Sequence, residues 1–150
     1  MTSDPDLSQN AIAMNSSQIA MSSRWVLGAG AGFALLAVIL GAFAAHGLKA
    51  VFDTRQLALF ETASRYQMYH ALALLVVGVM LTNPHFARSL LKLASLAFIL
   101  GIILFSGSLY LLALVGVSWL GAITPIGGIA FLSGWLLTMV AALKPVPSID

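Results

Sequence analysis

A stretch of about fifty residues, from Leu93 to Leu143, contains no charged side chain. One membrane-spanning helix needs roughly 20 consecutive apolar residues, so the stretch is long enough for two such helices. Inside hydrocarbon, every backbone N–H and C=O group must be hydrogen-bonded within the protein, which leaves helices and closed barrels as spanning structures. The stretch therefore indicates an integral membrane protein.

The composition narrows the fold class. Hydrophobic residues make up 60% of the chain, charged residues 8%, and the mean hydropathy is +0.99, whereas about a quarter of residues are charged in soluble domains. A membrane β-barrel needs segments of alternating hydrophobicity, which the chain lacks. We therefore expect an all-α fold, an integral membrane four-helix bundle. The absence of cysteine excludes thiolate metal sites.

The chain divides into a tail, a membrane domain and a second tail. Residues 1–24 are polar and rich in Ser and Asn, and we expect them to be disordered. Residues 144–150 form a short C-terminal tail. The membrane domain, residues 25–143, contains four predicted spans, at about residues 25–45, 66–81, 93–115 and 125–143. The first span is too long for the core of a cleaved signal peptide, although it ends in a sequence, Ala42-Phe43-Ala44, that resembles a cleavage site.

Local signals set several boundaries. Asp53 and Gln56 have the spacing of a capping box, which predicts a helix start and hence an interfacial amphipathic extension before the second span. Asn83-Pro84 predicts a turn. Thr124 suits the N-cap of the last span, with Pro125 at its first helical position.

Four spans place both termini on one side of the membrane. That side carries Arg24, Arg88, Lys92 and Lys144, and the other carries Lys49, Arg55 and Arg65. Basic residues favour the cytoplasmic side, so we expect a bacterial plasma (inner) membrane protein with cytoplasmic termini. These residues are scattered rather than clustered, which argues against a nucleic-acid partner.

Small residues recur along each span at helical spacing. Membrane helices associate by close packing over such residues, so we expect the stripes to serve packing within the bundle, with a dimer contact as the alternative. The principal packing positions are predicted to be Gly41, Gly78, Gly101, Gly127 and Gly134.

Polar side chains within the membrane domain gather toward one leaflet in the predicted topology. Such groups are costly in hydrocarbon and are therefore candidates for function. The predicted cluster consists of His46, Glu61, Gln67, Tyr69, His70, Ser106, Ser108, Tyr110 and Thr124.

This cluster has several interpretations. Its members can simply hydrogen-bond across helices, or they can form a polar pocket in which His46 and His70 carry protons. A zinc site needs three or four converging ligands, and Ser106 and Ser108 lack the context of a catalytic nucleophile. We therefore expect no metal, no cofactor and no enzymatic activity.

The same segments resemble the YgdD/YwdK-like family of small bacterial inner-membrane proteins, a family of unknown function. The resemblance is carried by Gly41–Leu48 (GAFAAHGL), Phe60–Ala63 (FETA), Tyr66–Leu72 (YQMYHAL), Phe105–Tyr110 (FSGSLY) and Gly121–Gly128 (GAITPIGG). It implies a four-helix membrane protein and supplies no reaction.

The functional hypothesis is a non-enzymatic membrane protein that binds a small ligand, a lipid or a partner protein through the polar cluster. The alternative is a subunit of a proton-coupled small-solute transporter or channel. The expected partners are the lipid bilayer and either a second copy of the chain or another membrane protein.

Overall fold

The computed structural model describes residues 5–144, and these residues are helical along almost their whole length. The predicted C-terminal tail and the first four residues lie, apart from Lys144, outside the described part. The elements are α1 (Pro5–Phe43), η1 (Ala44–Leu48), α2 (Thr54–Met80), α3 (Arg88–Gly101), η2 (Ile102–Ser106), α4 (Gly107–Val115), η3 (Ser118–Ala122) and α5 (Thr124–Leu143).

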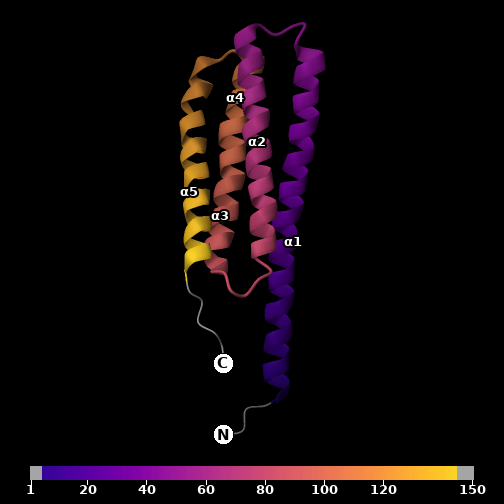
Figure 1. Cartoon of the computed structure of the whole chain (residues 1–150), viewed down its shortest axis with the longest axis vertical. Coiled ribbons are helices and arrows are strands. Elements are labelled where there is room, and N and C mark those ends of the chain that lie inside the picture. Colours follow the sequence, from indigo (N-terminus) through magenta and orange to yellow (C-terminus); the bar gives the residue numbers. More distant parts are fainter. Residues whose placement is uncertain (1–4, 145–150) are drawn as a thin grey trace.

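Four helical rods lie side by side along one axis (Figure 1). The first is α1 with its π-helical continuation η1, the second is α2, the third is α3, η2 and α4 in series, and the fourth is α5. Successive rods run in opposite directions, so both ends of the described chain lie at the same end of the bundle (Figure 1). The structure thus confirms the predicted all-α bundle.

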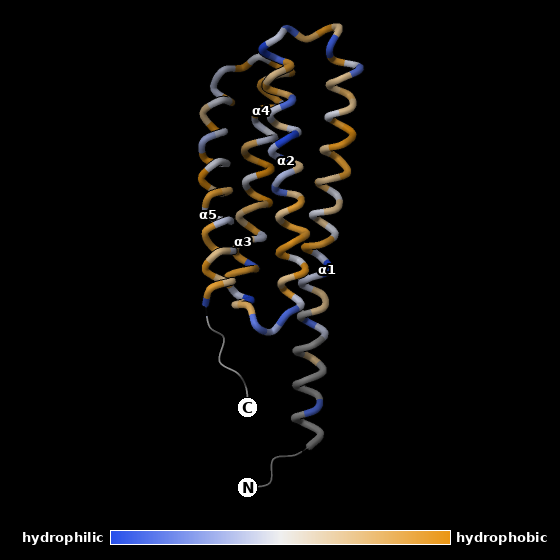
Figure 2. The backbone as a smooth tube through the Cα atoms, viewed as in Figure 1, coloured by the Kyte–Doolittle hydropathy of each residue, from blue (hydrophilic) through white to orange (hydrophobic). Residues whose placement is uncertain are grey.

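Three segments within residues 5–144 are long and apolar enough to cross a membrane, namely Ala20–Leu48, Arg88–Val115 and Ser118–Leu143. The first half of α2 is more polar and includes Glu61 and Arg65. Helix α2 nevertheless runs the length of the bundle between α1 and the other rods (Figure 1). Figure 2 shows hydrophobic residues along all four rods, with hydrophilic residues in the loops and in the first half of α2.

Helix α1 is longer than the sequence suggested. We expected residues 1–24 to be disordered, whereas α1 begins at Pro5 and projects beyond the bundle (Figure 1). Proline is well tolerated at the first helical position. The apolar span supplies the costly helix nucleus, and the Ala, Gln and Met residues before it propagate the helix at little cost. The hydroxyls of Ser17 and Ser22 bond to carbonyls of their own helix, at 2.9 Å each.

The start of α2 follows the predicted capping box. The backbone N–H of Gln56 donates to Asp53 Oδ1 at 2.7 Å, and the backbone N–H of Asp53 donates to Gln56 Oε1 at 3.0 Å. The extension predicted before the second span is continuous with the rest of α2. It packs into the bundle, because Phe60 is 3% exposed and Ala63 is fully buried.

Two other boundaries differ from the predictions. The third rod begins at Arg88, five residues before the predicted residue 93, after a turn in which the backbone N–H of His85 donates to Asn83 Oδ1 at 2.9 Å. The N-cap of α5 is Ile123 rather than Thr124. Thr124 does not cap the helix because its hydroxyl is hydrogen-bonded to Ser108 on the neighbouring rod.

The five glycines predicted for packing stand where two rods touch. A Cβ atom on Gly78 would lie 2.8 Å from Leu27, and one on Gly41 would lie 3.0 Å from Ser64 Oγ. On the other side of the bundle, a Cβ on Gly134 would lie 2.6 Å from the Phe98 ring. Gly101 faces the Phe131 ring in the same way, and Gly127 faces the backbone of Phe105. These contacts all lie within the chain.

Candidate functional site

The structure separates the predicted polar cluster into buried and exposed members. Gln67, His70, Ser106 and Ser108 are buried. His46, Glu61 and Tyr69 are exposed, and Tyr110 and Thr124 are half-buried. The nine residues therefore do not line one common pocket.

Gln67 ties three rods together. Its Nε2 atom donates to the carbonyl of Phe33 in α1 at 2.9 Å, and its Oε1 atom accepts from the Tyr110 hydroxyl in α4 at 3.1 Å. One turn away, Ser64 Oγ donates to the carbonyl of Ala37 at 3.0 Å. Ser64 is not among the polar residues predicted from the sequence. Hydrogen bonds within the bundle thus occupy the polar atoms at this level.

Ser108 and Thr124 form a second group. Their hydroxyl oxygens are 2.8 Å apart, and Ser108 Oγ also lies 3.0 Å from the carbonyl oxygen of Phe105. Ser106 lies within η2 and is 1% exposed, and its hydroxyl has no hydrogen-bond partner among the described residues. The partners of Ser108 include no base that would activate it as a nucleophile.

His70 belongs to a third group, which joins α2 to α5. Its Nε2 atom accepts from the indole N–H of Trp135 at 3.3 Å, and its Nδ1 atom is 2.8 Å from the carbonyl oxygen of Tyr66. The imidazole is stacked on the Phe131 ring, with ring centroids 3.4 Å apart and planes inclined by 6°. Both ring nitrogens are therefore engaged in contacts that hold helices together.

His46 lies far from His70 along the bundle axis. It is in η1, five residues beyond Gly41, which packs on Ser64 of α2, and His70 lies six residues beyond Ser64 in the opposite direction. At about 1.5 Å per residue, the two imidazoles differ in depth by roughly 17 Å. The predicted histidine pair is not formed. Across residues 5–144, no group of three His, Asp or Glu residues is placed to hold a metal ion.

An apolar groove is lined by residues of α2 and α5 and by Phe105 of η2. Its volume is about 440 Å³. It is lined mainly by aromatic side chains and opens outward, and its lining residues are Tyr66, Tyr69, His70, Phe105, Gly128, Phe131, Leu132 and Trp135. We call this feature the aromatic groove. Phe105, Phe131 and Trp135 are not among the site residues predicted from the sequence, although the i, i+4 spacing of Phe131 and Trp135 is a signal that places them on one helix face.

A smaller and more polar hollow adjoins the aromatic groove. It has a volume of about 340 Å³ and lies between α1 and α2. Its lining includes both charged residues of this part of α2, Glu61 and Arg65, together with Ser64. Tyr69 lines this hollow and the aromatic groove, so the two are neighbours on the surface.

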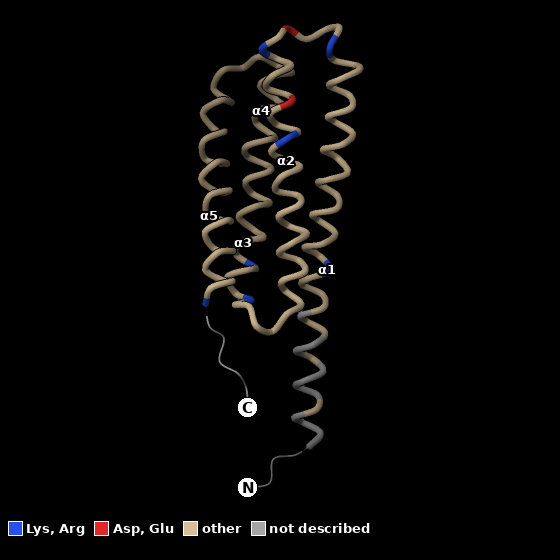
Figure 3. The backbone as a smooth tube through the Cα atoms, in the orientation of Figure 1, with Lys and Arg blue, Asp and Glu red and all other residues tan. Residues whose placement is uncertain are grey.

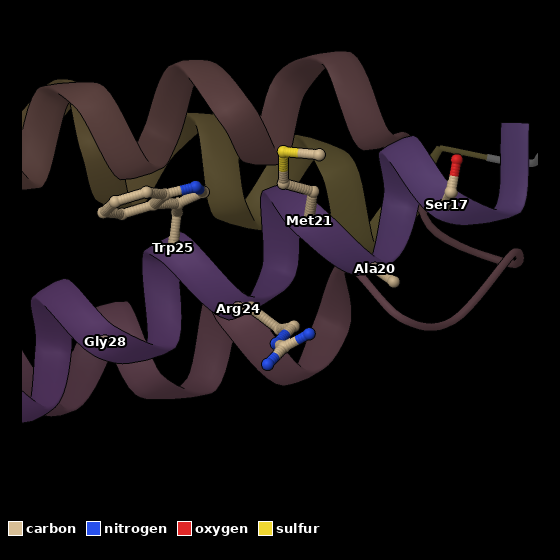
Figure 4. A pocket seen from close by; sticks show the side chains of 6 residues that line it. All are labelled: Ser17, Ala20, Met21, Arg24, Trp25 and Gly28. Atoms are coloured by element: carbon tan, nitrogen blue, oxygen red, sulfur yellow. The ribbon is translucent and has the colours of Figure 1, made fainter. Parts of the chain in front are cut away.

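A third hollow, of about 610 Å³, lies on α1 where that helix leaves the bundle. Figure 4 shows that Met21 and Trp25 point to one side of the helix, whereas Arg24 points to the other. All the lining residues come from α1. A depression on a single helix has no opposing wall, so it defines no specific ligand.

The fold and the arrangement of its polar groups define a small, all-helical, multi-pass membrane protein. The chain belongs to the DUF423 family, described as "Protein of unknown function", whose sequence model matches residues 40–128. The matched region begins just before η1 and ends at the fifth residue of α5. It therefore contains all nine residues of the predicted polar cluster.

Several bacterial proteins are similar over most of the chain. The UPF0382 membrane protein YwdK of Bacillus subtilis is 48% identical over 115 residues, which cover 77% of this chain and 93% of YwdK. A UPF0382 membrane protein of Staphylococcus epidermidis is 47% identical over 119 residues, covering 77% of this chain and 92% of that protein. One from Haemophilus influenzae is 43% identical over 108 residues, which cover 71% of this chain and 84% of that protein. No solved structure matches the chain.

Proposed function

We propose that the protein is a non-enzymatic membrane component that binds one phospholipid, with an acyl chain in the aromatic groove. The observation that carries this proposal is the groove itself, about 440 Å³ of apolar space lined by aromatic rings. Ligand pockets for small molecules have volumes of roughly 300 to 1,000 Å³ and predominantly apolar linings. The groove therefore has the size and chemistry of a site for a hydrocarbon chain.

The surroundings of the groove favour a ligand that arrives from the bilayer. Leu132 on its rim is 72% exposed, and Leu72 and Leu136 on the neighbouring turns are 49% and 57% exposed. Large aliphatic side chains with this exposure face lipid in a membrane bundle. A lipid chain can thus enter sideways without crossing a polar surface.

The proton-coupled transporter or channel is less well supported. That hypothesis needed His46 and His70 in one hydrated pocket, and the two residues lie at different depths. The polar atoms of Gln67, His70 and Ser108 form hydrogen bonds between and within rods. Self-association and a membrane protein partner remain compatible with lipid binding, and no feature of the bundle favours a nucleic acid.

We infer that the protein resides in the bacterial plasma membrane with both termini in the cytoplasm. The relatives are bacterial membrane proteins. Charged residues lie at the two ends of the bundle and in the first half of α2 (Figure 3). The end that carries the termini has four basic residues, Arg24, Arg88, Lys92 and Lys144, and basic residues favour the cytoplasmic side.

A substitution that fills the aromatic groove tests the proposal. Gly128 lies in its lining, and a Cβ there would meet only Phe105, at 4.0 Å, so Gly128→Leu occupies the groove without disturbing the backbone. Gly32→Leu is the matched control, because Gly32 has no neighbour within 4 Å of a Cβ position. Native mass spectrometry of protein released from nanodiscs is expected to show one retained phospholipid on the wild type and on Gly32→Leu, and none on Gly128→Leu. Equal retention by all three proteins would contradict the proposal.

A further inference from the structure

The depth of the polar hollow follows from contacts between α4 and α5. Helix α5 has 20 residues and is about 30 Å long, which matches the hydrocarbon thickness of a bilayer. Its first residue, Thr124, therefore marks one edge of the hydrocarbon core. Ser108 is at the same level, because its hydroxyl oxygen lies 2.8 Å from that of Thr124.

Two contacts between aromatic rings show which residues of α2 lie at the same depth as Ser108. The rings of Tyr66 and Phe105 have centroids 4.8 Å apart, and those of Phe60 and Tyr110 have centroids 4.6 Å apart. Ser108 lies between Phe105 and Tyr110 on the third rod. The edge of the hydrocarbon core therefore meets α2 between residues 60 and 66.

That interval contains Glu61 and Arg65, one helical turn apart. Both side chains are exposed and both line the polar hollow. A charged group is costly inside hydrocarbon and is stabilised there by a charged partner or by water. At the edge of the core, such partners are available in the head groups of phospholipids.

The order of the two charges along the membrane normal selects the head group. Arg65 lies deeper in the bundle than Glu61, since α2 runs inward from Thr54. In a phospholipid, the phosphate is attached to the glycerol and the head-group amine follows it. A guanidinium at the deeper position therefore faces the phosphate, and the carboxylate of Glu61 faces the amine.

We propose that the phospholipid in the aromatic groove is phosphatidylethanolamine, with its phosphate on Arg65 and its ammonium group on Glu61. This inference rests on the proposed lipid-binding function. Tyr69 lines both hollows, so the head group and the acyl chain of one lipid can occupy them together. Choline lacks N–H donors and phosphatidylglycerol lacks a cation, so neither satisfies Glu61 equally well.

Lipids with identical acyl chains and different head groups test the assignment. Nanodiscs are prepared with equal amounts of phosphatidylethanolamine, phosphatidylcholine and phosphatidylglycerol, and the retained lipid is counted by native mass spectrometry. The wild type is expected to retain phosphatidylethanolamine about threefold over phosphatidylcholine, the effect of a partly exposed charged contact. Glu61→Gln is expected to remove that preference, and Arg65→Gln to lower retention of all three lipids.

Arg55→Gln is the control, because it removes a positive charge from α2 outside the polar hollow and is expected to keep the wild-type preference. Equal retention of the three lipids by the wild type, with Gly128→Leu still lowering all of them, would overturn the head-group assignment and leave chain binding intact. Retention insensitive to Gly128→Leu would instead remove the proposed function. A lipid-free dimer lost in both Glu61→Gln and Arg65→Gln would assign this face to a second copy of the chain and overturn the proposal.

Discussion

Trp135 of α5 donates its indole N–H to Nε2 of His70 in α2, at 3.3 Å. Indole nitrogen is only a donor, so Nε2 of His70 must be unprotonated. The other ring nitrogen then carries the proton and donates to the carbonyl of Tyr66, at 2.8 Å. His70 is thus a neutral, fixed imidazole that joins two rods and contributes to the wall of the aromatic groove. In this arrangement both ring nitrogens of His70 are engaged in hydrogen bonds.

The hydrogen bond between these helices should contribute measurably to stability. Trp135→Phe keeps an aromatic ring and removes the donor, and we expect a loss of about 0.6 to 1.7 kcal/mol, from the average to the maximum found for hydrogen bonds between membrane helices. Reversible unfolding in mixed micelles is the measurement. Trp119→Phe is the control, since Trp119 is 63% exposed in η3. A Trp135→Phe protein as stable as the control would refute this role.

The tautomer of His70 is directly observable. With ¹⁵N-labelled histidine, the His70 side chain is expected to give the resonance pattern of a neutral ring protonated at Nδ1. His70→Gln identifies the signals, and His46→Gln is expected to leave them unchanged because His46 is exposed and distant. Protonation of His70 at Nε2 would be incompatible with the Trp135 contact.

Much of the fold could be predicted from the sequence because it depends on local patterns. The capping box of Asp53 and Gln56 marked the start of α2, and long apolar runs marked the other three rods. The predicted end of the third rod, residue 115, is followed by Gly116. In the structure Gly116 adopts a left-handed conformation with φ of 69°, which costs glycine little. The extent of α1 does not follow from composition, because a polar composition predicts disorder although the residues before the first span are adequate helix formers.

The arrangement of the polar residues was harder to predict. Topology gives the approximate depth of a side chain, but the direction in which it points depends on helix rotation and register. His46 and His70 illustrate the difficulty. Both were expected near one face of the membrane, and a difference of a few helical turns in their depth keeps the two side chains out of contact. The π-helical stretches η1 and η2 change the helical phase, and no local motif comparable to the capping box marks them in the sequence. The aromatic groove depends on that phase, since Phe105 lies within η2.

A close contact between α5 and the third rod provides a sharp packing test. A Cβ on Gly127 would collide with the backbone of Phe105, whereas one on the adjacent Gly128 would have space. We expect Gly127→Ala to lower the free energy of unfolding by about 1 to 3 kcal/mol, the usual cost of overpacking. Gly128→Ala should change it by less than about 0.5 kcal/mol. Equal effects at the two positions would show that α5 is rotated relative to this structure.

The Gln67 network predicts a coupling between two substitutions. Gln67→Leu and Tyr110→Phe each remove one partner of the 3.1 Å hydrogen bond, so their effects on unfolding should be non-additive by about 0.6 kcal/mol or more. Tyr69→Phe is the matched control, because Tyr69 is 54% exposed and is expected to be additive with Gln67→Leu. Additivity of the first pair would mean that the hydrogen bond contributes nothing to stability.

Photocrosslinking with a phospholipid that carries a diazirine on its acyl chain tests the central claim most directly. Leu132 in the groove lining is 72% exposed, and Leu35 on α1 is 62% exposed, so random contact with lipid would label the two to a similar extent. We predict adducts concentrated on Leu132 and Trp135, and a loss of this excess in Gly128→Leu. Equal labelling of Leu132 and Leu35 in the wild type would contradict the account.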